Sequence, residues 1–223
     1  MRILVIIPAY CEAQKIYNVV QNVISRGYDV LVIDDGSQDN TADEARRAGA
    51  VVLRHYINRG YGAALETGDQ WAIKNNYDIA VHFDGDGQHN PNEIKNLVNP
   101  IIREKVDVVI GSRFLSKNAS VPIIRKLLIK LAIIFTWMLS SIKLSDAHNG
   151  FRAFNRKALI SLDCRQDGMS YASEVIDQIV ENKLRIGETP VTIQYTDYSK
   201  LKGESNIKKI FVGMRFIWGK LIR

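Results

Sequence analysis

The sequence predicts an α/β fold in which a mostly parallel, Rossmann-like sheet carries helices on both faces. Four short, largely apolar runs rich in Val and Ile fall at residues 3–7, 30–33, 51–53 and 79–83. Each run is followed by a segment of helical character, at residues 13–25, 41–48, 61–74 and 91–103. Apolar strands that alternate with helices are typical of a parallel sheet buried on both sides.

The second half of the chain continues this pattern with fewer strands. We expect a strand at 106–110, a long apolar helix at 123–142, and a turn from 146 that leads into a short strand by 154. A helix at 170–182, a strand at 184–195 and a polar, basic loop at 196–206 follow. Residues 1–206 are therefore predicted to form one domain.

The terminal segment 207–223 is predicted to be a separate amphipathic helix. Its apolar residues recur at helical spacing, at Ile207, Ile210, Phe211, Met214, Ile217, Trp218, Leu221 and Ile222. From Ser205 to the end there are five basic residues and no acidic one. Such a helix suits an anionic membrane surface, and it equally suits docking on the domain.

Composition narrows the class of protein and its location. The 223 residues carry a formal net charge of +6, which favours phosphate-rich ligands or an anionic membrane, and we expect no nucleic-acid partner. Cys11 and Cys164 lie far apart without metal-ligand spacing, as in a reducing cytosol. The first apolar run is too short for a signal peptide, and the run at 131–142 is too short to span a bilayer. We therefore expect a cytoplasmic protein, peripheral at the inner face of the membrane.

An acidic turn, Asp84-Gly85-Asp86-Gly87-Gln88-His89, follows the fourth apolar run. In open α/β sheets ligands collect beyond the carboxyl ends of the strands, so both carboxylates should face that crevice. Hard oxygen ligands suit Mg²⁺ or Mn²⁺, which would in turn hold nucleotide phosphates. A calcium loop of the EF-hand type is excluded, because it needs Gly at position six and Glu at position twelve, where this chain has His89 and Lys95.

Polar residues also follow the first two strands. Asp35 stands at a strand end, where we expect it to bind ligand, whereas Asp39 and Thr41 suit capping of the next helix. The Gly60-x-Gly62 pair lacks the third glycine of a dinucleotide fingerprint and lies outside the first βα turn, which argues against a dehydrogenase. The helix amino terminus there could meet a phosphate or form only a tight turn.

Arg113 follows the predicted fifth strand directly, in Gly111-Ser112-Arg113. An arginine at that edge can neutralise a diphosphate through paired hydrogen bonds. We therefore expect Arg113 to be one of the cations of the site.

Five motifs, in order, resemble those of the GT-A-fold glycosyltransferases, in particular the dolichyl-phosphate mannosyltransferase-like enzymes. They are residues 6–12 (IIPAYCE), 34–37 (DDGS), 84–89 (DGDGQH), 111–113 (GSR) and 149–152 (NGFR), and the resemblance covers nearly the whole chain. It departs from the usual pattern at Cys11, where the family has Asn, and at Asn206, where Lys is frequent.

The resemblance implies a role for each matching residue. The donor nucleotide sugar would be held by Pro8, Ala9, Tyr10, Glu12, Ile33, Asp35, Asp84, Gly85, Arg113, Lys200 and Lys202. The metal would be held by Asp84, Asp86 and Gln88. Catalysis would involve Asp86, Arg113 and Glu174, the last near the start of the predicted helix 170–182.

The implied reaction is inverting transfer of a sugar from GDP-mannose or a UDP-sugar to a polyprenyl phosphate, with Mg²⁺ or Mn²⁺ as cofactor. A phosphate acceptor is already an anion and needs no base, whereas a glycan hydroxyl would need Glu174 as general base. Basic residues near the start of 123–142 suggest a second helix at a membrane surface, although a core helix would look similar. A non-catalytic nucleotide-sugar-binding subunit, or an enzyme with an integral-membrane partner, also remains open.

Overall fold

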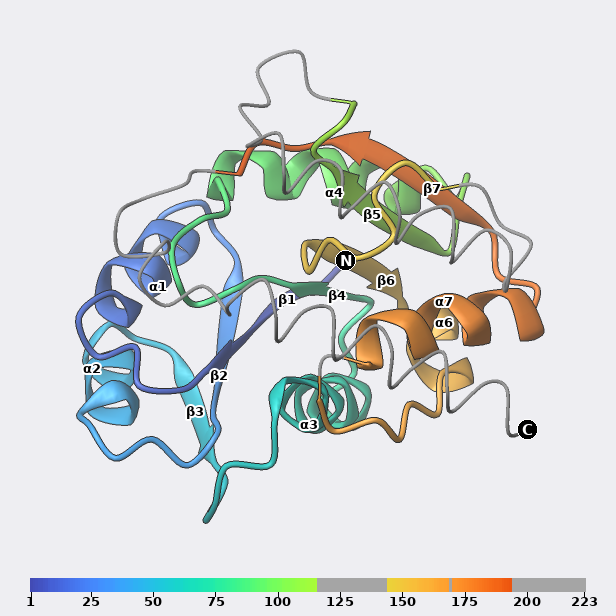
Figure 1. The fold of residues 1–223 in the computed structure, drawn as a ribbon. Helices are drawn as coiled ribbons and strands as arrows, with labels where there is room; N and C mark the ends of the chain where they lie inside the picture. Colours follow the sequence, from blue (N-terminus) through green and yellow to red (C-terminus); the bar gives the residue numbers. More distant parts are fainter. Residues whose placement is uncertain (116–143, 169, 194–223) are drawn as a thin grey trace.

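The computed structural model describes residues 1–115, 144–168 and 170–193, which form a sheet between two layers of helices (Figure 1). Within these ranges the sheet has seven strands in the order β3-β2-β1-β4-β6-β5-β7. The strands are β1 (Ile3–Ala9), β2 (Asp29–Asp34), β3 (Val51–Arg54), β4 (Ile79–His82), β5 (Val108–Ser112), β6 (Arg152–Asn155) and β7 (Ile186–Pro190). Among these seven described strands only β6 runs antiparallel to its neighbours, so the expected mostly parallel sheet is confirmed.

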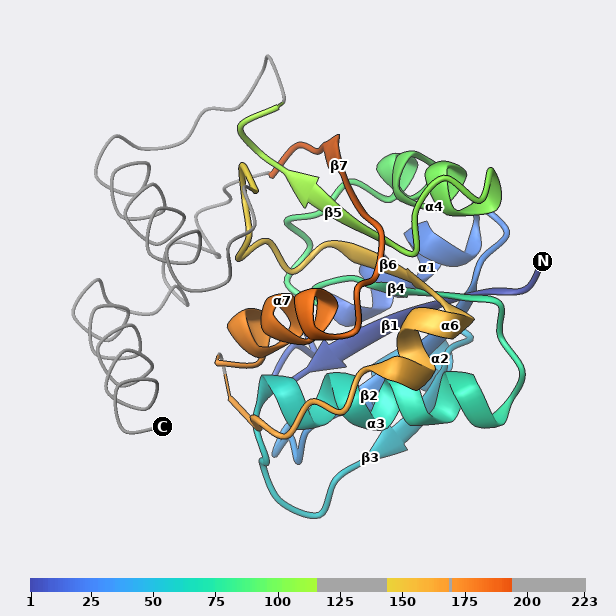
Figure 2. The same cartoon turned by 90° about the vertical axis from the view of Figure 1, so that its right-hand side faces the viewer.

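Helices cover both faces of this sheet (Figure 2). One face packs on α1 (Ile16–Ile24), α2 (Thr41–Arg47) and α4 (Ile94–Ile102), the last preceded by the short 3₁₀ helix η1 (Pro91–Glu93). The other face packs on α3 (Tyr61–Lys74), α6 (Arg156–Ser161) and α7 (Tyr171–Glu181). Helices on both faces explain why the strands carry apolar residues on both sides.

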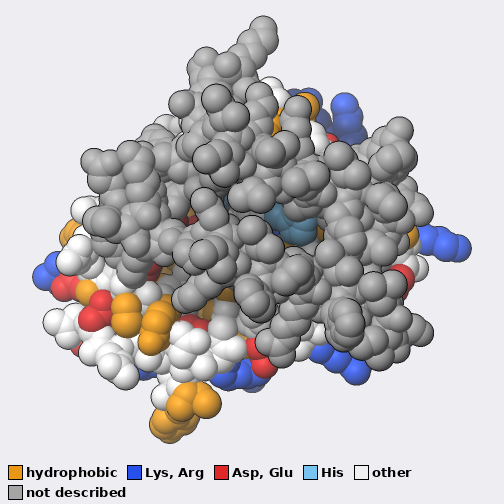
Figure 3. All heavy atoms as spheres, viewed as in Figure 1, with side chains coloured by type: hydrophobic (Ala, Val, Ile, Leu, Met, Phe, Trp, Pro, Cys, Tyr) orange, Lys and Arg blue, Asp and Glu red, His pale blue; other side chains and the backbone are white. Residues whose placement is uncertain are grey.

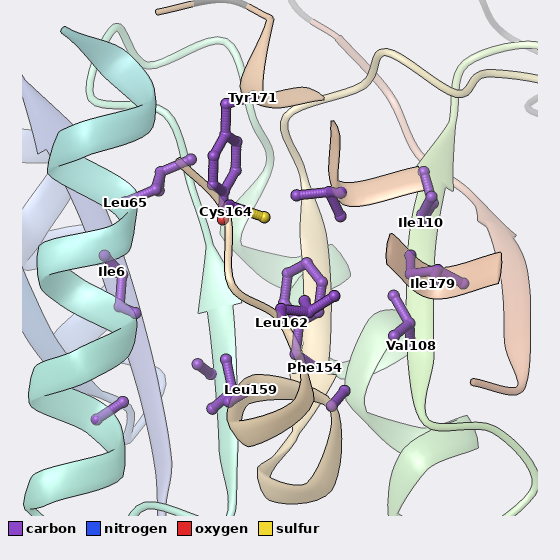
Figure 4. Close-up of a cluster of buried hydrophobic side chains, with 14 of the residues drawn as sticks. Ile6, Leu65, Val108, Ile110, Phe154, Leu159, Leu162, Cys164, Tyr171 and Ile179 are labelled. Carbon is purple, nitrogen blue, oxygen red and sulfur yellow. The ribbon is translucent and has the colours of Figure 1, made fainter. Parts of the chain in front are cut away.

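The core on the α3, α6 and α7 face shows how the sequence produces this packing (Figure 4). Ile6 and Ile110 point from the sheet toward Leu65 of α3 and Ile179 of α7, and all four are buried. Val5 and Val109, which directly precede Ile6 and Ile110, belong to the core on the other face of the sheet. Successive strand side chains alternate between faces, so each strand contributes to both cores.

The sheet order reverses direction at β1, which lies between β2 and β4. In open α/β sheets this reversal opens a crevice beyond the carboxyl ends of the two central strands. The chain leaves β1 through residues 10–15 and leaves β4 through residues 83–90. The fold therefore brings the first motif and the acidic turn to one place.

Several element boundaries differ from the expectation. Helix α1 begins at Ile16 rather than at 13, because the Glu12 carbonyl accepts the Lys15 and Ile16 N–H groups and forms a turn first. Strand β7 ends at Pro190, since its neighbour β5 ends opposite it at Ser112. Helix α6 was not predicted.

The N-cap of α2 is Asn40, without a side-chain cap hydrogen bond, so the expected capping by Asp39 or Thr41 takes another form: the Asp39 side chain accepts the N–H of Thr41, the first helical residue, at 3.1 Å. Other expectations lie outside the described residues. These are the helices at 123–142 and 207–223, the loop at 196–206, and the residues Lys200 and Lys202.

Candidate active site

A cavity of about 1330 Å³ lies beyond the carboxyl ends of β1 and β4. Its wall includes eleven of the predicted site residues: Pro8, Ala9, Tyr10, Glu12, Asp35, Asp84, Gly85, Asp86, Gln88, Arg113 and Glu174. A histidine side chain is visible near the middle of the face shown in Figure 3, and three histidines, His82, His89 and His148, line the cavity. The fold therefore collects residues from both halves of the sequence around one cavity.

Ile33 is the exception among the predicted residues in the described ranges. Its side chain is fully buried in the core on the α3 face and does not line the cavity. The alternation of the strand turns Ile33 toward the core, so a side-chain contact with a nucleoside is not available to it.

Asp84 is held firmly by two side chains. Tyr61 donates from its hydroxyl to Oδ1 at 3.0 Å, and His89 Nε2 lies 2.9 Å from Oδ2. Burial disfavours the charged carboxylate, but His89 and Tyr61 outweigh it and lower the pKa of Asp84. Burial and the adjacent Asp84 raise the pKa of Tyr61, so its phenol stays protonated as the donor. Asp84 is therefore a fixed negative charge in the cavity wall.

Gly150 makes this arrangement possible from the other side. A Cβ at position 150 would stand 2.8 Å from the Tyr61 hydroxyl and 3.0 Å from Asp84 Oδ2. The glycine of the 149–152 motif thus leaves the space that the Asp84 carboxylate occupies.

Asp86 has a different environment from Asp84. It accepts hydrogen bonds from the Gln88 N–H at 3.0 Å and the Gln88 side-chain amide at 2.6 Å. Burial and the charge of Asp84 raise the pKa of Asp86. Two carboxylates crowded in this way are stabilised by a cation between or beside them.

These residues fit a divalent metal, but only a partly protein-ligated one. In the described ranges no three His, Cys, Asp or Glu side chains come close enough to hold a metal ion. Mg²⁺ and Mn²⁺ commonly take one or two carboxylates and complete their shell with water and substrate phosphates. Asp86, with Gln88 after rotation of its amide, offers such a partial set of oxygen ligands.

The loop after β1 is tied to the loop after β2. The Cys11 N–H donates to the Ser37 hydroxyl at 2.9 Å, and the Glu12 N–H donates to the Thr41 hydroxyl at 2.8 Å. Cys11 has a φ of 53°, in the left-handed region that Asn adopts more readily than Cys. This backbone conformation would suit the Asn that the resemblance implies for this position better than it suits Cys.

Asp35 forms structural hydrogen bonds that were not predicted from the sequence. Its carboxylate lies 2.7 Å from His55 Nδ1 and accepts the N–H groups of Arg59 and Gly60 at 2.9 and 2.7 Å. These contacts hold the loop between β3 and α3 against the cavity. Any ligand contact by Asp35 would be added to this role.

The start of α3 forms a tight turn and not an open phosphate site. The N–H groups of Gly62 and Ala63 donate to the Asp167 carbonyl at 2.8 and 3.2 Å. Those two amides are therefore already satisfied, which favours the tight-turn interpretation of this helix end.

Arg113 lies in the cavity wall, paired with a buried carboxylate. Its Nε and Nη2 donate to Oδ2 and Oδ1 of Asp146, both at 2.7 Å, and the Asp146 side chain is completely buried. A bidentate pair of this kind fixes the plane of the guanidinium group. The sequence identified Arg113 but not its partner.

A second arginine, Arg152, also lines the cavity, and no role was predicted for it beyond its place in the 149–152 motif. It is 2% exposed and donates to the carbonyls of Asn149, Ala147 and Ala172 at 2.8, 3.0 and 3.3 Å. It forms no ion pair within the described ranges. Burial, Arg152 and Arg113 lower the pKa of His148 to about 4, which leaves that imidazole neutral at pH 7. Arg152 and the Asp146-bound Arg113 therefore place two guanidinium groups in the cavity wall.

Glu174 lines the cavity near the start of α7. Its Oε2 accepts the N–H groups of Arg165 and Gln166 at 3.0 and 2.8 Å. The carboxylate thus holds the loop whose Asp167 carbonyl caps α3. This structural role was not predicted, and it restricts a general-base role to the other oxygen.

Comparisons with known proteins agree with this geometry. Residues 4–163 match the family described as glycosyl transferase family 2. The chain is 32% identical to a UDP-N-acetylglucosamine–dolichyl-phosphate N-acetylglucosaminyltransferase of Methanococcus voltae, across 99% of this chain and 95% of that protein. It is 29% identical to an undecaprenyl-phosphate mannosyltransferase of Micrococcus luteus, across 100% and 96%.

Among solved structures, glucosyl-3-phosphoglycerate synthase from Mycobacterium tuberculosis, in complex with Mn²⁺, UDP and phosphoglyceric acid, has the same fold. Its TM-score is 0.69 at 20% identity, over 90% of this chain and 73% of that one. The same enzyme has also been crystallised with Mg²⁺ and UDP. In the described part of the present chain, no helix has both the length and the apolar character needed to cross a bilayer.

Proposed function

Because the chain belongs to glycosyl transferase family 2, and is thus a glycosyltransferase of GT-A fold, we propose that it transfers a sugar from a nucleotide-diphosphate donor to a polyprenyl phosphate. Relatives that align over nearly their whole length are named for polyprenyl-phosphate acceptors with either GlcNAc or mannose. The donor of this chain is accordingly a UDP-sugar or GDP-mannose.

The observation that carries the proposal is a cavity lined by both acidic and basic side chains. Glu12, Asp35, Asp84 and Asp86 line it together with Arg113 and Arg152. An acidic turn suits a metal-bound diphosphate, and arginines suit phosphate groups whose charge no metal has neutralised. A donor diphosphate and an acceptor phosphate meet these two requirements together.

A divalent metal would be held by Asp86 and Gln88, with Asp84 as a second-sphere contact. When bound, it would supply Lewis-acid stabilisation of the charge on the departing diphosphate. Asp84 stays charged because His89 and Tyr61 hold it, so it keeps the turn attractive to a cation.

On the acceptor side, the residues position an existing nucleophile and need not generate one. A phosphate monoester is anionic near neutral pH, so one of its oxygens can attack the anomeric carbon without losing a proton to the protein. Attack from the face opposite the departing diphosphate inverts the configuration there. Arg152 would hold the phosphate for that attack, while Arg113 would contact the departing diphosphate.

The alternative acceptor, a glycan hydroxyl, needs a general base, for which Glu174 is the predicted candidate. Two backbone N–H groups already donate to its Oε2. That engagement favours a structural role for Glu174 and therefore favours the phosphate acceptor.

A direct assay tests the proposal. The protein is incubated with Mn²⁺, a panel of UDP- and GDP-sugars and a short-chain polyprenyl phosphate, and the lipid fraction is examined by mass spectrometry. We expect one donor to yield a sugar phosphopolyprenol, with none formed when the phosphate is replaced by the free alcohol. Transfer to glycan hydroxyls alone would contradict the acceptor, and donor binding without any transfer would indicate a non-catalytic subunit.

A further inference from the structure

We propose that Glu188, on the edge strand β7, is a positioning residue that fixes Arg113 in the cavity wall by way of Asp146. The residue lies outside the cavity lining and outside every sequence motif. The inference rests on the proposed function only in that it assigns Arg113 a phosphate group to bind.

The Glu188 carboxylate accepts hydrogen bonds from Asp146 and from the residue before it, Ser145. Its Oε1 accepts the Ser145 N–H at 2.9 Å, the Ser145 hydroxyl at 2.8 Å and the Asp146 N–H at 3.2 Å. Its Oε2 lies 3.0 Å from the same Ser145 N–H. One carboxylate therefore sets the backbone of two successive residues.

Asp146 in turn fixes the position of Arg113. Besides the bidentate contact to the guanidinium, its Oδ2 accepts the Arg113 backbone N–H at 3.0 Å. Main chain and side chain of Arg113 are thus bound to one carboxylate, which is completely buried. A shift of Asp146 must shift or release the guanidinium group.

The sheet register explains why Glu188 can do this from an edge strand. Strand β7 runs parallel to β5 with Glu188 opposite Ile110, three residues before Arg113. The Ser112 and Ser145 hydroxyls, 2.6 Å apart, add a second tie between β5 and the same segment. Side chains from both strands therefore form hydrogen bonds to residues 145 and 146.

Glu188 forms no ion pair within the described ranges, so its charge is compensated only by hydrogen-bond donors. Bonds from neutral donors to a charged acceptor are stronger than those between neutral groups. Replacement by Gln keeps the size of the side chain and removes the charge, which should loosen Ser145 and Asp146 without opening a cavity.

The test is a double-mutant cycle read by calorimetry, with inorganic pyrophosphate and Mn²⁺ as the probe. Wild type, E188Q, R113K and the double variant are compared, with E181Q at the exposed end of α7 as the matched control. We expect E188Q to weaken pyrophosphate binding about tenfold in the wild-type background. In the R113K background, where the bidentate pair is already lost, the same change should weaken binding less than twofold.

Two results would overturn the proposal. One is an equal loss from E188Q in both backgrounds, which would mean that Glu188 acts on binding independently of Arg113. The other is unchanged pyrophosphate binding in E188Q with a lowered melting temperature, which would leave it a purely structural residue. Sugar transfer by the wild type is measured separately, so a failure of the proposed reaction leaves the pyrophosphate cycle interpretable.

Discussion

Gly150→Ala tests whether the Asp84 carboxylate must stay where Tyr61 and His89 hold it. The added Cβ would stand 2.8 Å from the Tyr61 hydroxyl and 3.0 and 3.1 Å from the two Asp84 oxygens. These atoms must move by a few tenths of an ångström. Overpacking of this kind costs about 1–3 kcal/mol, and the stiffer unfolded chain offsets about 0.4–1 kcal/mol of it.

The expected loss of stability is therefore small, and the melting temperature should fall by only a few degrees. The effect on transfer should be much larger, since a misplaced binding group can lower kcat/KM by about 100-fold. Thermal unfolding and steady-state transfer kinetics measure the two quantities on the same samples.

Gly168→Ala is the matched control, because Gly168 lines the same cavity and a Cβ there meets no atom of the described residues within 4 Å. It should keep both its stability and its kinetics. If Gly150→Ala showed the same kinetics as Gly168→Ala, the position of the Asp84 carboxylate would not matter for transfer.

Three further predictions concern other parts of the molecule. Cys11→Asn should raise the melting temperature by roughly 1–4 °C, because Asn accommodates the φ of 53° better, and a lower melting temperature would count against this account. Hydrogen bonds from Arg185 hold the pKa of Asp107 well below its usual range, so its stabilisation is present above the unfolded-state pKa of about 4 and is lost as the pH falls below it. Asp107→Asn should thus lower stability by about 1–3 kcal/mol at pH 7 in denaturant titrations, with a gap from wild type that closes in acid; a constant gap would contradict the charge-based explanation. Asp86→Ala, or EDTA added to the wild type, should abolish the Mn²⁺-dependent binding of nucleoside diphosphates in calorimetry, and unchanged affinity would remove the metal assignment.

Much of the fold could be predicted because burial leaves a direct trace in the sequence. The residues of β1, β2 and β4 are apolar on both sides, since each strand lies between two helical layers. The antiparallel course of β6 could not be predicted, because its direction depends on pairing with β4 and β5, far away in the chain. Helix α6 left one local signal, Asn155, whose side chain accepts the Ala158 N–H at 2.8 Å as an N-cap.

The site was predictable where residues cluster in short motifs at strand ends. Asp84, Asp86 and Gln88 belong to one turn, so their proximity follows from the local sequence. The partners Asp146 and Glu188 lie 33 and 75 residues beyond Arg113, and only the sheet brings them to it. Asp35 was predicted to bind ligand and Glu174 to act as a general base. In the structure both carboxylates accept hydrogen bonds from backbone N–H groups of loops.

The most direct test of the central claim is transfer to polyprenyl phosphate by Glu174→Gln. If the acceptor is a phosphate that needs no base, this variant should keep most of the wild-type kcat with the donor found in the screen, because the Gln amide oxygen can still accept both loop hydrogen bonds that Oε2 accepts in the wild type. A melting curve on the same sample reports any loosening of the loop. A fall in kcat of several orders of magnitude, with the melting temperature unchanged, would show that a general base is required and would contradict the phosphate-acceptor mechanism.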